Sequence, residues 1–282
     1  MCAIIGWSGK LPKGLLTSML LQAEKRGHDS TGIAYRLDGQ NKSVREAVPA
    51  SKFVSGRENS SLLSQARRSL RGIAHTRRAS PNMPVDHRNA HPFPFWRYFF
   101  AHNGRIVNWP DVKETLIDHY TMELNGADIN NDVERIKTAR YCLEYCQGKL
   151  VDGAYIGGIT TDSMVIGPYI NGRDFSSLVG CMGLAWMIKN QVYVFRYAKE
   201  VVGVNIIWQG SEDKQCHLLT LAASTYEIIY ESLSRVDGLE SHIVEHELTE
   251  GVVYRLEPTG FVQEGLALVN APIEDEFSSE TV

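Results

Sequence analysis

The sequence lacks the features of secreted, membrane-spanning and nucleic-acid-binding proteins. Only five of its 282 residues are cysteine, an odd and widely spaced set that predicts no disulfide framework. No apolar run approaches the roughly 18 residues of a membrane span, and no basic and apolar signal-peptide pattern opens the chain. Acidic residues outnumber basic ones by 33 to 29, for a net charge of −4. We therefore expect a cytoplasmic protein without a membrane or nucleic-acid partner.

The composition that remains is that of an ordinary globular protein, with 43% apolar and 22% charged residues. The sequence contains no internal repeat and no long linker. We expect one domain over residues 2–265, followed by a C-terminal tail over residues 266–282 that ends in an acidic stretch. The polar segment 55–64 predicts an interior loop.

Short strands dominate the expected secondary structure. Apolar and β-branched runs predict strands at 2–8, 32–37, 70–75, 98–102, 153–159, 164–166, 184–188, 192–195, 201–207, 242–247 and 251–256. Helical spacing predicts helices at 13–25, at 131–147 and, as a short element, from Trp109. Ser224 to Glu227 has the Ser-x-x-Glu form of a capping box before a fourth helix. Because βαβ alternation is absent, we expect a mainly antiparallel, layered α+β fold.

Cys2 stands directly behind the initiator methionine. Aminopeptidases remove Met1 when the next side chain is small, and Cys2 would then carry a thiol and a free α-amino group on one carbon. The α-amine has a pKa of about 7.7–8.0 and the thiol about 8.5, so a proton passes between them at little cost near neutral pH. The alternative is a cysteine that packs in a buried strand.

Three further segments occur in order behind MCAIIG: RGHDSTGIA at 26–34, GIAHTRRAS at 72–80 and FAHNGRIVN at 100–108. Together they resemble the glutaminase domain of class II glutamine amidotransferases, which are N-terminal-nucleophile hydrolases. The pattern is nearest to the glucosamine-6-phosphate synthase and amidophosphoribosyltransferase branches. The resemblance covers residues 2–165 clearly and 166–260 only in strand pattern. It implies a four-layer αββα sandwich of two antiparallel sheets.

The resemblance also implies a catalytic set. Cys2 would attack the side-chain amide of L-glutamine and form a γ-glutamyl thioester. Asn103 and Gly104 would form the oxyanion hole with a side-chain amide and a backbone N–H. The same Asn-Gly pair is also the strongest short sequence signal for a type I′ hairpin turn, and a tight turn and an oxyanion hole are compatible.

The implied glutamine-binding residues lie in the second motif and behind it. Arg77 resembles the arginine that clamps the α-carboxylate of glutamine, a task suited to a planar bidentate donor. The alternative is a surface arginine in the basic stretch 67–78. Ser80 stands where the synthase pattern has a threonine near the substrate. His91 matches a histidine of the glutamine loop, and a loop-packing role is an equal alternative.

The α-ammonium group of glutamine requires a carboxylate. Asp132 has the Asp-x-Glu-x-Ile form of the family's amine-binding aspartate, and Asp128 is a second candidate. The competing interpretation is that Asp132 caps the helix that follows.

Hydrolysis of the glutamine amide releases ammonia, and two departures from the family pattern bear on the molecule that accepts it. Arg78 stands where the synthase has its gating tryptophan, and no synthase domain follows the glutaminase segment. We therefore expect a glutamine amidotransferase subunit that supplies ammonia to a synthase on another chain; self-association is compatible with the sequence. The alternatives are a stand-alone γ-glutamyl amidohydrolase of the same fold and, if Met1 is retained, a non-catalytic binding or regulatory homologue.

We expect neither a cofactor nor a metal. Residues 242–246 spell H-x-x-E-H, but they lie in an expected strand, whereas zinc would need both histidines on one helical face. Cys142 and Cys146 lie one helical turn apart without paired ligands in the sequence, which favours core packing.

Overall fold

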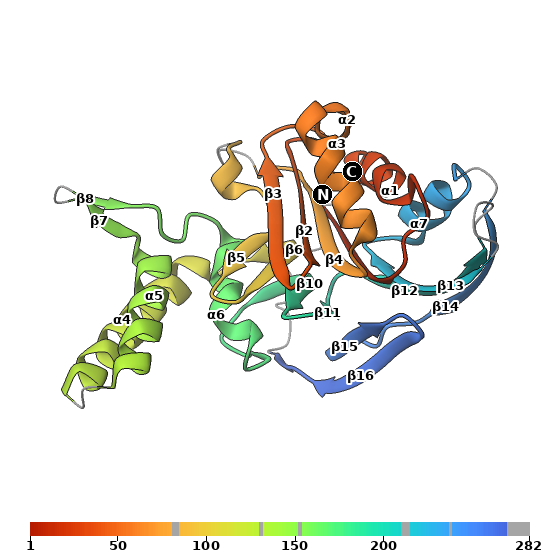
Figure 1. Cartoon of the computed structure of the whole chain (residues 1–282). Helices are drawn as coiled ribbons and strands as arrows, with labels where there is room; N and C mark the ends of the chain where they lie inside the picture. The colour runs from red at the N-terminus through yellow and green to blue at the C-terminus, as the bar shows by residue number, and fades with distance from the viewer. Residues whose placement is uncertain (81–84, 130–131, 152–153, 210–214, 237–238, 270–282) are drawn as a thin grey trace. The chain divides into compact units, whose positions relative to one another are not determined.

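The structure is a computed structural model that describes residues 1–80, 85–129, 132–151, 154–209, 215–236 and 239–269 (Figure 1). The chain divides into two compact units. The first comprises Met1–Gly104 and Met182–Leu266, and the second comprises Arg105–Cys181 and Ala267–Val282.

A seven-stranded sheet with the strand order β14-β12-β13-β1-β4-β2-β3 is the centre of the first unit. Its strands are β1 (Ala3–Gly9), β2 (Ser30–Leu37), β3 (Gln40–Glu46), β4 (Arg71–Arg77), β12 (Val202–Gln209), β13 (Cys216–Ala223) and β14 (Glu240–His246). All their pairings are antiparallel. Strand β1 lies in the middle of this sheet, between β13 and β4, so the residues next to Cys2 are held on both sides.

A six-stranded sheet with the order β16-β15-β11-β10-β6-β5 packs against the larger one. Its strands are β5 (Phe93–Phe95), β6 (Tyr98–Ile106), β10 (Gly180–Ile188), β11 (Gln191–Tyr197), β15 (Val252–Glu257) and β16 (Gly260–Leu266). Ile4 and Ile73 of the larger sheet and Ala101, Val192 and Leu256 of the smaller one share a single buried apolar cluster. The inner faces of the two sheets therefore form a common core.

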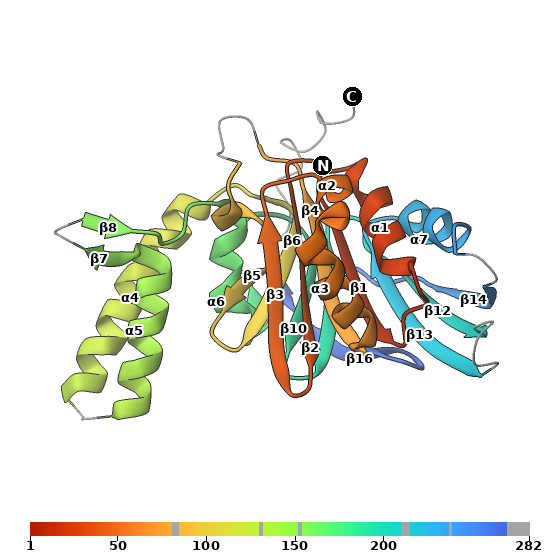
Figure 2. The same cartoon turned by 45° about the horizontal axis from the view of Figure 1, so that its top comes forward.

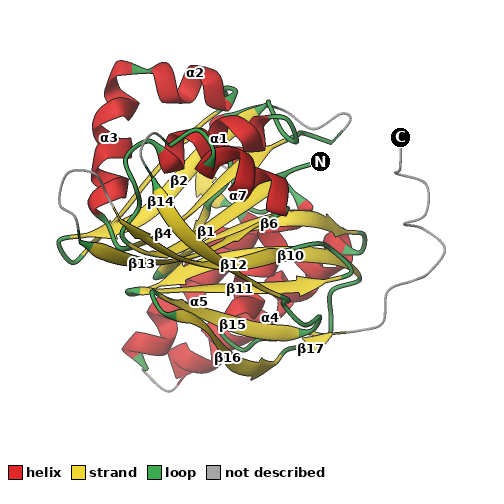
Figure 3. Ribbon diagram, turned by 90° about the vertical axis from the view of Figure 1, so that its right-hand side faces the viewer, coloured by secondary structure: helices red, strands yellow, loops and turns green. Residues whose placement is uncertain are grey.

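Helices cover the outer face of the larger sheet (Figure 3). They are α1 (Leu15–Glu24), α2 (Ala50–Ser55), α3 (Arg57–Arg68) and α7 (Tyr226–Leu233). Alternate residues of β1, namely Ala3, Ile5 and Trp7, are fully buried against this layer. Figure 2 shows α1 and α7 side by side, and Leu15, Met19 and Ile229 belong to the same buried cluster. The apolar faces of the strands, which repeat every 2 residues, pack here against the apolar faces of the helices, which repeat every 3.6 residues, and together they form a second core.

The second unit is mainly helical. A hairpin of α4 (Trp109–Ile129) and α5 (Val133–Gln147) is joined by an ion pair between Glu123 and Arg135 at 2.9 Å. Its other elements are β7 (Lys149–Val151), β8 (Ala154–Ile156), η2 (Asp162–Ile166), α6 (Gly167–Ile170), β9 (Asp174–Phe175) and β17 (Leu268–Val269). Of the predicted tail, Leu266 still belongs to β16 and Leu268–Val269 form β17, which pairs with β9. Residues 270–282 lie outside the described part of the chain.

The prediction of a mainly antiparallel α+β fold is confirmed, and three local predictions are wrong. Segment 55–64 forms most of α3 rather than a loop, because Asn59 is buried and donates hydrogen bonds to Glu46 and to the Phe53 carbonyl. The helix from Trp109 is 21 residues long, not short. Residues 164–166 lie in the 3₁₀ helix η2 rather than in a strand, since three apolar residues do not distinguish these structures.

Within the part of the chain that the structure describes, no helix has the length and apolarity needed to cross a lipid bilayer.

Candidate active site

Cys2 lies half-buried at the entrance of the central strand β1. Its thiol donates to the carbonyl oxygen of Arg78, with the sulfur 3.6 Å from that oxygen. Arg26 donates from Nε to the Cys2 carbonyl oxygen at 3.2 Å, and its Nη2 lies 3.8 Å from the sulfur of Met1. Two of the sequence motifs thus meet the nucleophile candidate directly.

The RGHD loop at 26–29 lies against the end of β4. The Asp29 N–H donates to the Arg77 carbonyl oxygen at 2.9 Å, and the Ala79 N–H donates to the Asp29 carboxylate at 2.7 Å. A Cβ on Gly27 would lie 2.5 Å from the Arg77 carbonyl carbon, closer than real atoms approach. Glycine at 27 is therefore required for this contact. The contacts of Arg26 and Asp29 were not predictable from the motif alone, because they join segments far apart in the sequence: Arg26 and Cys2 are 24 residues apart, and Asp29 and Ala79 are 50 residues apart.

Asn103 is connected to the nucleophile strand through Ser224, the first residue of the predicted capping box. Its side-chain Nδ2 donates to the Ser224 hydroxyl oxygen at 3.1 Å, and the Ile4 N–H donates to the same oxygen at 2.9 Å. The predicted capping box is wrong: Thr225 is the N-cap residue of α7 and makes no side-chain cap bond. Ser224 instead joins β1 to β6.

The hairpin alternative for Asn103-Gly104 is also wrong. Strand β6 runs from Tyr98 through this pair to Ile106 without a turn. Asn103 is 2% exposed and Gly104 is half-buried. The turn propensity of the Asn-Gly pair is outweighed here, because β6 pairs with β10 on one side and β5 on the other in the smaller sheet, and this pairing holds its backbone extended.

Two histidines are packed behind the site. His75 of β4 and His91 lie in edge-to-face contact, with ring centroids 4.0 Å apart and 2.9 Å between His75 Nε2 and His91 Nδ1. His75 Nε2 also lies 3.0 Å from the His102 carbonyl oxygen, which fits a donated N–H. Burial lowers the pKa of His75 from 6.5 to about 3, assisted by the charge of Arg77. Burial, then the neighbouring His75, holds the pKa of His91 well below its usual value.

The predicted binding residues differ in burial and in their position relative to Cys2. Arg77 is 6% exposed and directly follows Thr76, which pairs with Ala3, so Arg77 and Cys2 lie at the same end of adjacent strands. Ser80 is exposed beyond that strand end. His91 is 3% exposed, and its contacts with His75 and Phe93 agree with the loop-packing alternative.

Asp132 belongs to the second unit. It is the N-cap residue of α5, where its carboxylate accepts the Arg135 N–H at 3.1 Å. The capping interpretation is therefore confirmed as a contact, and the amine-binding role remains a prediction. Asp128 lies exposed near the end of α4.

The buried His75 gives a test of this packing through pH. Its pKa is 6.5 unfolded and about 3 folded, so between these values the unfolded chain binds a proton that the folded chain does not. We expect the free energy of unfolding to fall as the pH drops below 6.5, with His75 contributing up to about 1.4 kcal/mol per pH unit. In His75→Asn, which keeps an N–H for the His102 carbonyl, the free energy of unfolding should depend less steeply on pH between pH 7 and pH 5 than in the wild type, as measured by urea unfolding. Equal slopes would contradict the assignment; His28→Gln, whose side chain is 64% exposed, is the control.

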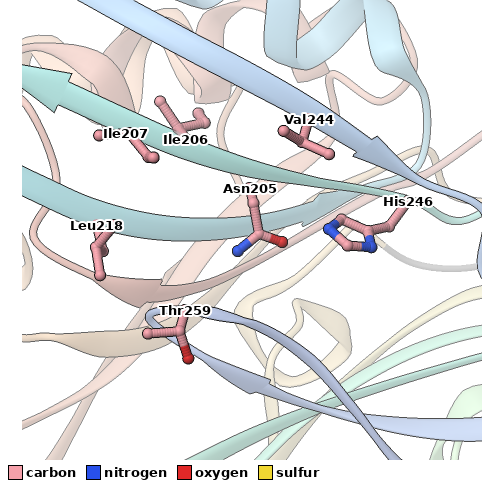
Figure 4. A pocket seen from close by; sticks show the side chains of 7 residues that line it. All are labelled: Asn205, Ile206, Ile207, Leu218, Val244, His246 and Thr259. Carbon is pink, nitrogen blue, oxygen red and sulfur yellow. The ribbon is translucent and has the colours of Figure 1, made fainter.

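A separate hollow of about 290 Å³ lies over β12, β13 and β14 (Figure 4). It is lined by Asn205, Ile206, Ile207, Leu218, Val244, His246 and Thr259. Leu218 and Ser224 are six residues apart along the β13 segment, which corresponds to roughly 20 Å. The hollow is therefore distinct from the corner that contains Cys2.

Two stacked antiparallel sheets with helices on the outside define the fold of the N-terminal-nucleophile hydrolases. The solved structures that share it include glutamine phosphoribosylpyrophosphate amidotransferase from B. subtilis (TM-score 0.54, 15% identity, 93% of this chain and 49% of that one) and the allosteric regulatory enzyme of purine biosynthesis (TM-score 0.56, 14% identity, 93% and 48%). The predicted fold class is confirmed.

The sequence comparisons find similarity to curated glutamine–fructose-6-phosphate aminotransferases. The chain is 34% identical over 154 residues to glutamine–fructose-6-phosphate aminotransferase (isomerizing) of Fusobacterium nucleatum, covering 53% of this chain and 23% of that protein. It is 38% identical over 125 residues to the protein of that name from Bartonella henselae, covering 44% and 20%. No protein-family profile matches the chain. The resemblance drawn from the motifs is confirmed, and these homologues are enzymes; the chain spans about a fifth to a quarter of their length.

Proposed function

We propose that this protein is the glutaminase component of a glutamine amidotransferase and that Cys2, freed by removal of Met1, is its nucleophile. The observation that carries the proposal is the convergence of separate motifs on Cys2. Its thiol contacts the Arg78 carbonyl, its own carbonyl accepts from Arg26, and its strand is joined through Ser224 to Asn103. A cysteine that only packs in a strand needs no such surroundings.

In the proposed reaction the thiol proton of Cys2 passes to the α-amine of the same residue, and the thiolate attacks the amide carbon of glutamine. The oxyanion accepts hydrogen bonds from Asn103 Nδ2 and the Gly104 N–H. Collapse of this intermediate breaks the C–N bond, and the α-ammonium protonates the departing ammonia. Water, deprotonated by the free amine, then hydrolyses the thioester and releases glutamate.

The electrostatics of the N-terminus favour an amine that acts as a base. Burial, together with the charges of Arg78, Arg26 and Lys199, lowers the pKa of the Met1 α-amino group below 8.0, although the neighbouring Cys2 raises it. After removal of Met1, the amine of Cys2 would lie close to the same cations. Its neutral form would then prevail at a lower pH than that of an exposed amine.

For the substrate, we assign the α-carboxylate of glutamine to Arg77 and its α-ammonium to Asp132, with Ser80 near the substrate and His91 packed behind it in the glutamine loop. Burial, and to a lesser extent the charge of the buried Arg77, lowers the pKa values of His75 and His91, which therefore stay neutral, and the guanidinium of Arg77 supplies the positive charge for a carboxylate. For Asp132, the support is the sequence pattern alone, since its described contact is the helix cap.

We further propose that the ammonia is passed to an acceptor bound by a synthase on another chain. The supporting observation is that the homologous proteins are named as aminotransferases acting with glutamine and fructose 6-phosphate. Glutaminase turnover should then be slow alone and faster with the partner, because acceptor-dependent loop ordering prevents loss of ammonia. A stand-alone γ-glutamyl amidohydrolase is the second candidate, and a non-catalytic homologue that retains Met1 is the third.

Three measurements separate these functions. Intact mass of the purified protein should correspond to a chain that begins at Cys2, and glutamate release should follow a pH profile with a midpoint below 8.0. Retained Met1 with no glutamate release would favour the non-catalytic homologue. Fast hydrolysis of a γ-glutamyl amide larger than glutamine, unaffected by proteins that co-purify, would favour the stand-alone hydrolase.

A further inference from the structure

The end of β13 places a fully buried hydroxyl beside the nucleophile strand. Ser224 is 0% exposed and lies one residue beyond Ala223, which pairs with Ile5. Its N–H donates to the Ile4 carbonyl oxygen at 3.2 Å, and its hydroxyl oxygen accepts the Ile4 N–H at 2.9 Å. The side chain therefore continues the hydrogen bonding of β1 at the point where the main chain turns away into α7.

The same hydroxyl oxygen accepts a second hydrogen bond, from Asn103 Nδ2 at 3.1 Å. A hydroxyl oxygen has two lone pairs, and here one receives the Ile4 N–H and the other the Asn103 amide. The terminal torsion of asparagine is broad and nearly two-fold, so packing alone does not decide which end of the amide faces a substrate. In the structure the Ser224 oxygen accepts from Asn103 Nδ2, and this hydrogen bond holds the NH₂ end of the amide at Ser224.

A carboxamide NH₂ group carries two hydrogens at fixed angles in one plane. When one of them is held by Ser224, the direction of the other is determined. If this second hydrogen stabilises the oxyanion, as the proposed function requires, its aim depends on Ser224. The hydroxyl also bonds Ile4, two residues from Cys2, and thus fixes the oxyanion donor relative to the strand that carries the nucleophile.

We propose that Ser224 is a positioning residue for glutamine hydrolysis, which orients the Asn103 carboxamide toward the oxyanion and ties it to the nucleophile strand. The inference rests on the proposed glutaminase function. Ser224 does not touch the substrate; it acts through Asn103. Its effect should therefore appear in the bond-breaking step and disappear when Asn103 is absent.

The test is a double-mutant cycle on the full chain with glutamine as substrate. We expect Ser224→Ala to lower kcat about 10- to 100-fold while KM changes little, since misdirecting one oxyanion donor costs somewhat less than removing it. Asn103→Ala should lower kcat about 100- to 1,000-fold. The double variant should be no slower than Asn103→Ala. If Ser224 had only a structural role, independent of Asn103, the kcat loss of the double variant would be the product of the two single losses.

Two further variants test the role of the Ser224 hydroxyl if Ser224→Ala folds poorly. Ser224→Thr retains the hydroxyl and should restore kcat to within a few-fold of wild type, and Thr225→Ala, whose side chain makes no cap bond, is the matched control with wild-type kcat. An aldehyde analogue of glutamine forms an adduct with a thiol that places an oxygen anion in the oxyanion hole. In Ser224→Ala the affinity for this analogue should fall by a factor similar to the loss of kcat, whereas the affinity for glutamate should not change.

The outcomes are distinct. A wild-type protein without glutaminase activity would overturn the proposed function and this inference with it. An active wild type whose Ser224→Ala variant keeps kcat within two-fold, or whose losses multiply with those of Asn103→Ala, would overturn the role of Ser224 alone.

Discussion

Cys2→Ala is expected to abolish glutamate release from glutamine while the protein stays folded. The substitution removes the only atom proposed to form a covalent bond with the substrate, and the residual rate should fall by a factor of roughly 10⁴ or more, to the detection limit. Ala3, Ile4 and Ile5, which fix β1 in its sheet, are untouched and fully buried. Thermal unfolding should therefore shift by only a few degrees.

The remaining cysteines provide the control for this prediction. Cys216 is exposed, whereas Cys142, Cys146 and Cys181 are buried. Burial raises the pKa of Cys146 to about 12, which keeps it a thiol at neutral pH. Alanine at each of these positions should leave kcat intact, and wild-type glutaminase activity in Cys2→Ala would contradict the mechanism.

Arg77→Ala is expected to raise KM for glutamine about 100-fold with a smaller effect on kcat. A bidentate guanidinium–carboxylate contact persists from the bound substrate to the transition state, so its loss weakens binding of both. Arg77→Lys should recover only part of the affinity, because an ammonium group lacks the planar fork. Steady-state kinetics over a wide glutamine range measure the split, and an unchanged KM in Arg77→Ala would contradict the assignment.

The aspartates form a matched pair for the other end of the substrate. Asp132→Asn should raise KM while asparagine, a good N-cap residue, preserves the start of α5. Asp128→Asn should leave KM unchanged. The reverse result would move the amine-binding role to Asp128.

Most strands were predictable because their apolar residues alternate or run together. Trp7 and Tyr35 are buried in strands that the sequence predicts, and α1 follows the predicted spacing of Leu15, Leu16 and Met19. The polar helix α3 was not predictable in the same way. Its stability depends on tertiary contacts of the buried Asn59 and Ala66, and local propensity carries little information about such contacts.

The class of fold, the family resemblance and the candidate nucleophile could all be predicted from the sequence, because each depends on residue types and their order along the chain. The residues that surround Cys2 could be identified only in the folded chain. The Asn103–Ser224 hydrogen bond spans 121 residues and the Ile4–Ser224 bond spans 220. A Ser-x-x-Glu pattern read locally indicates a helix cap, and it became a link between two strands because strand pairing brought Ser224 opposite Ile4, where a buried N–H required an acceptor.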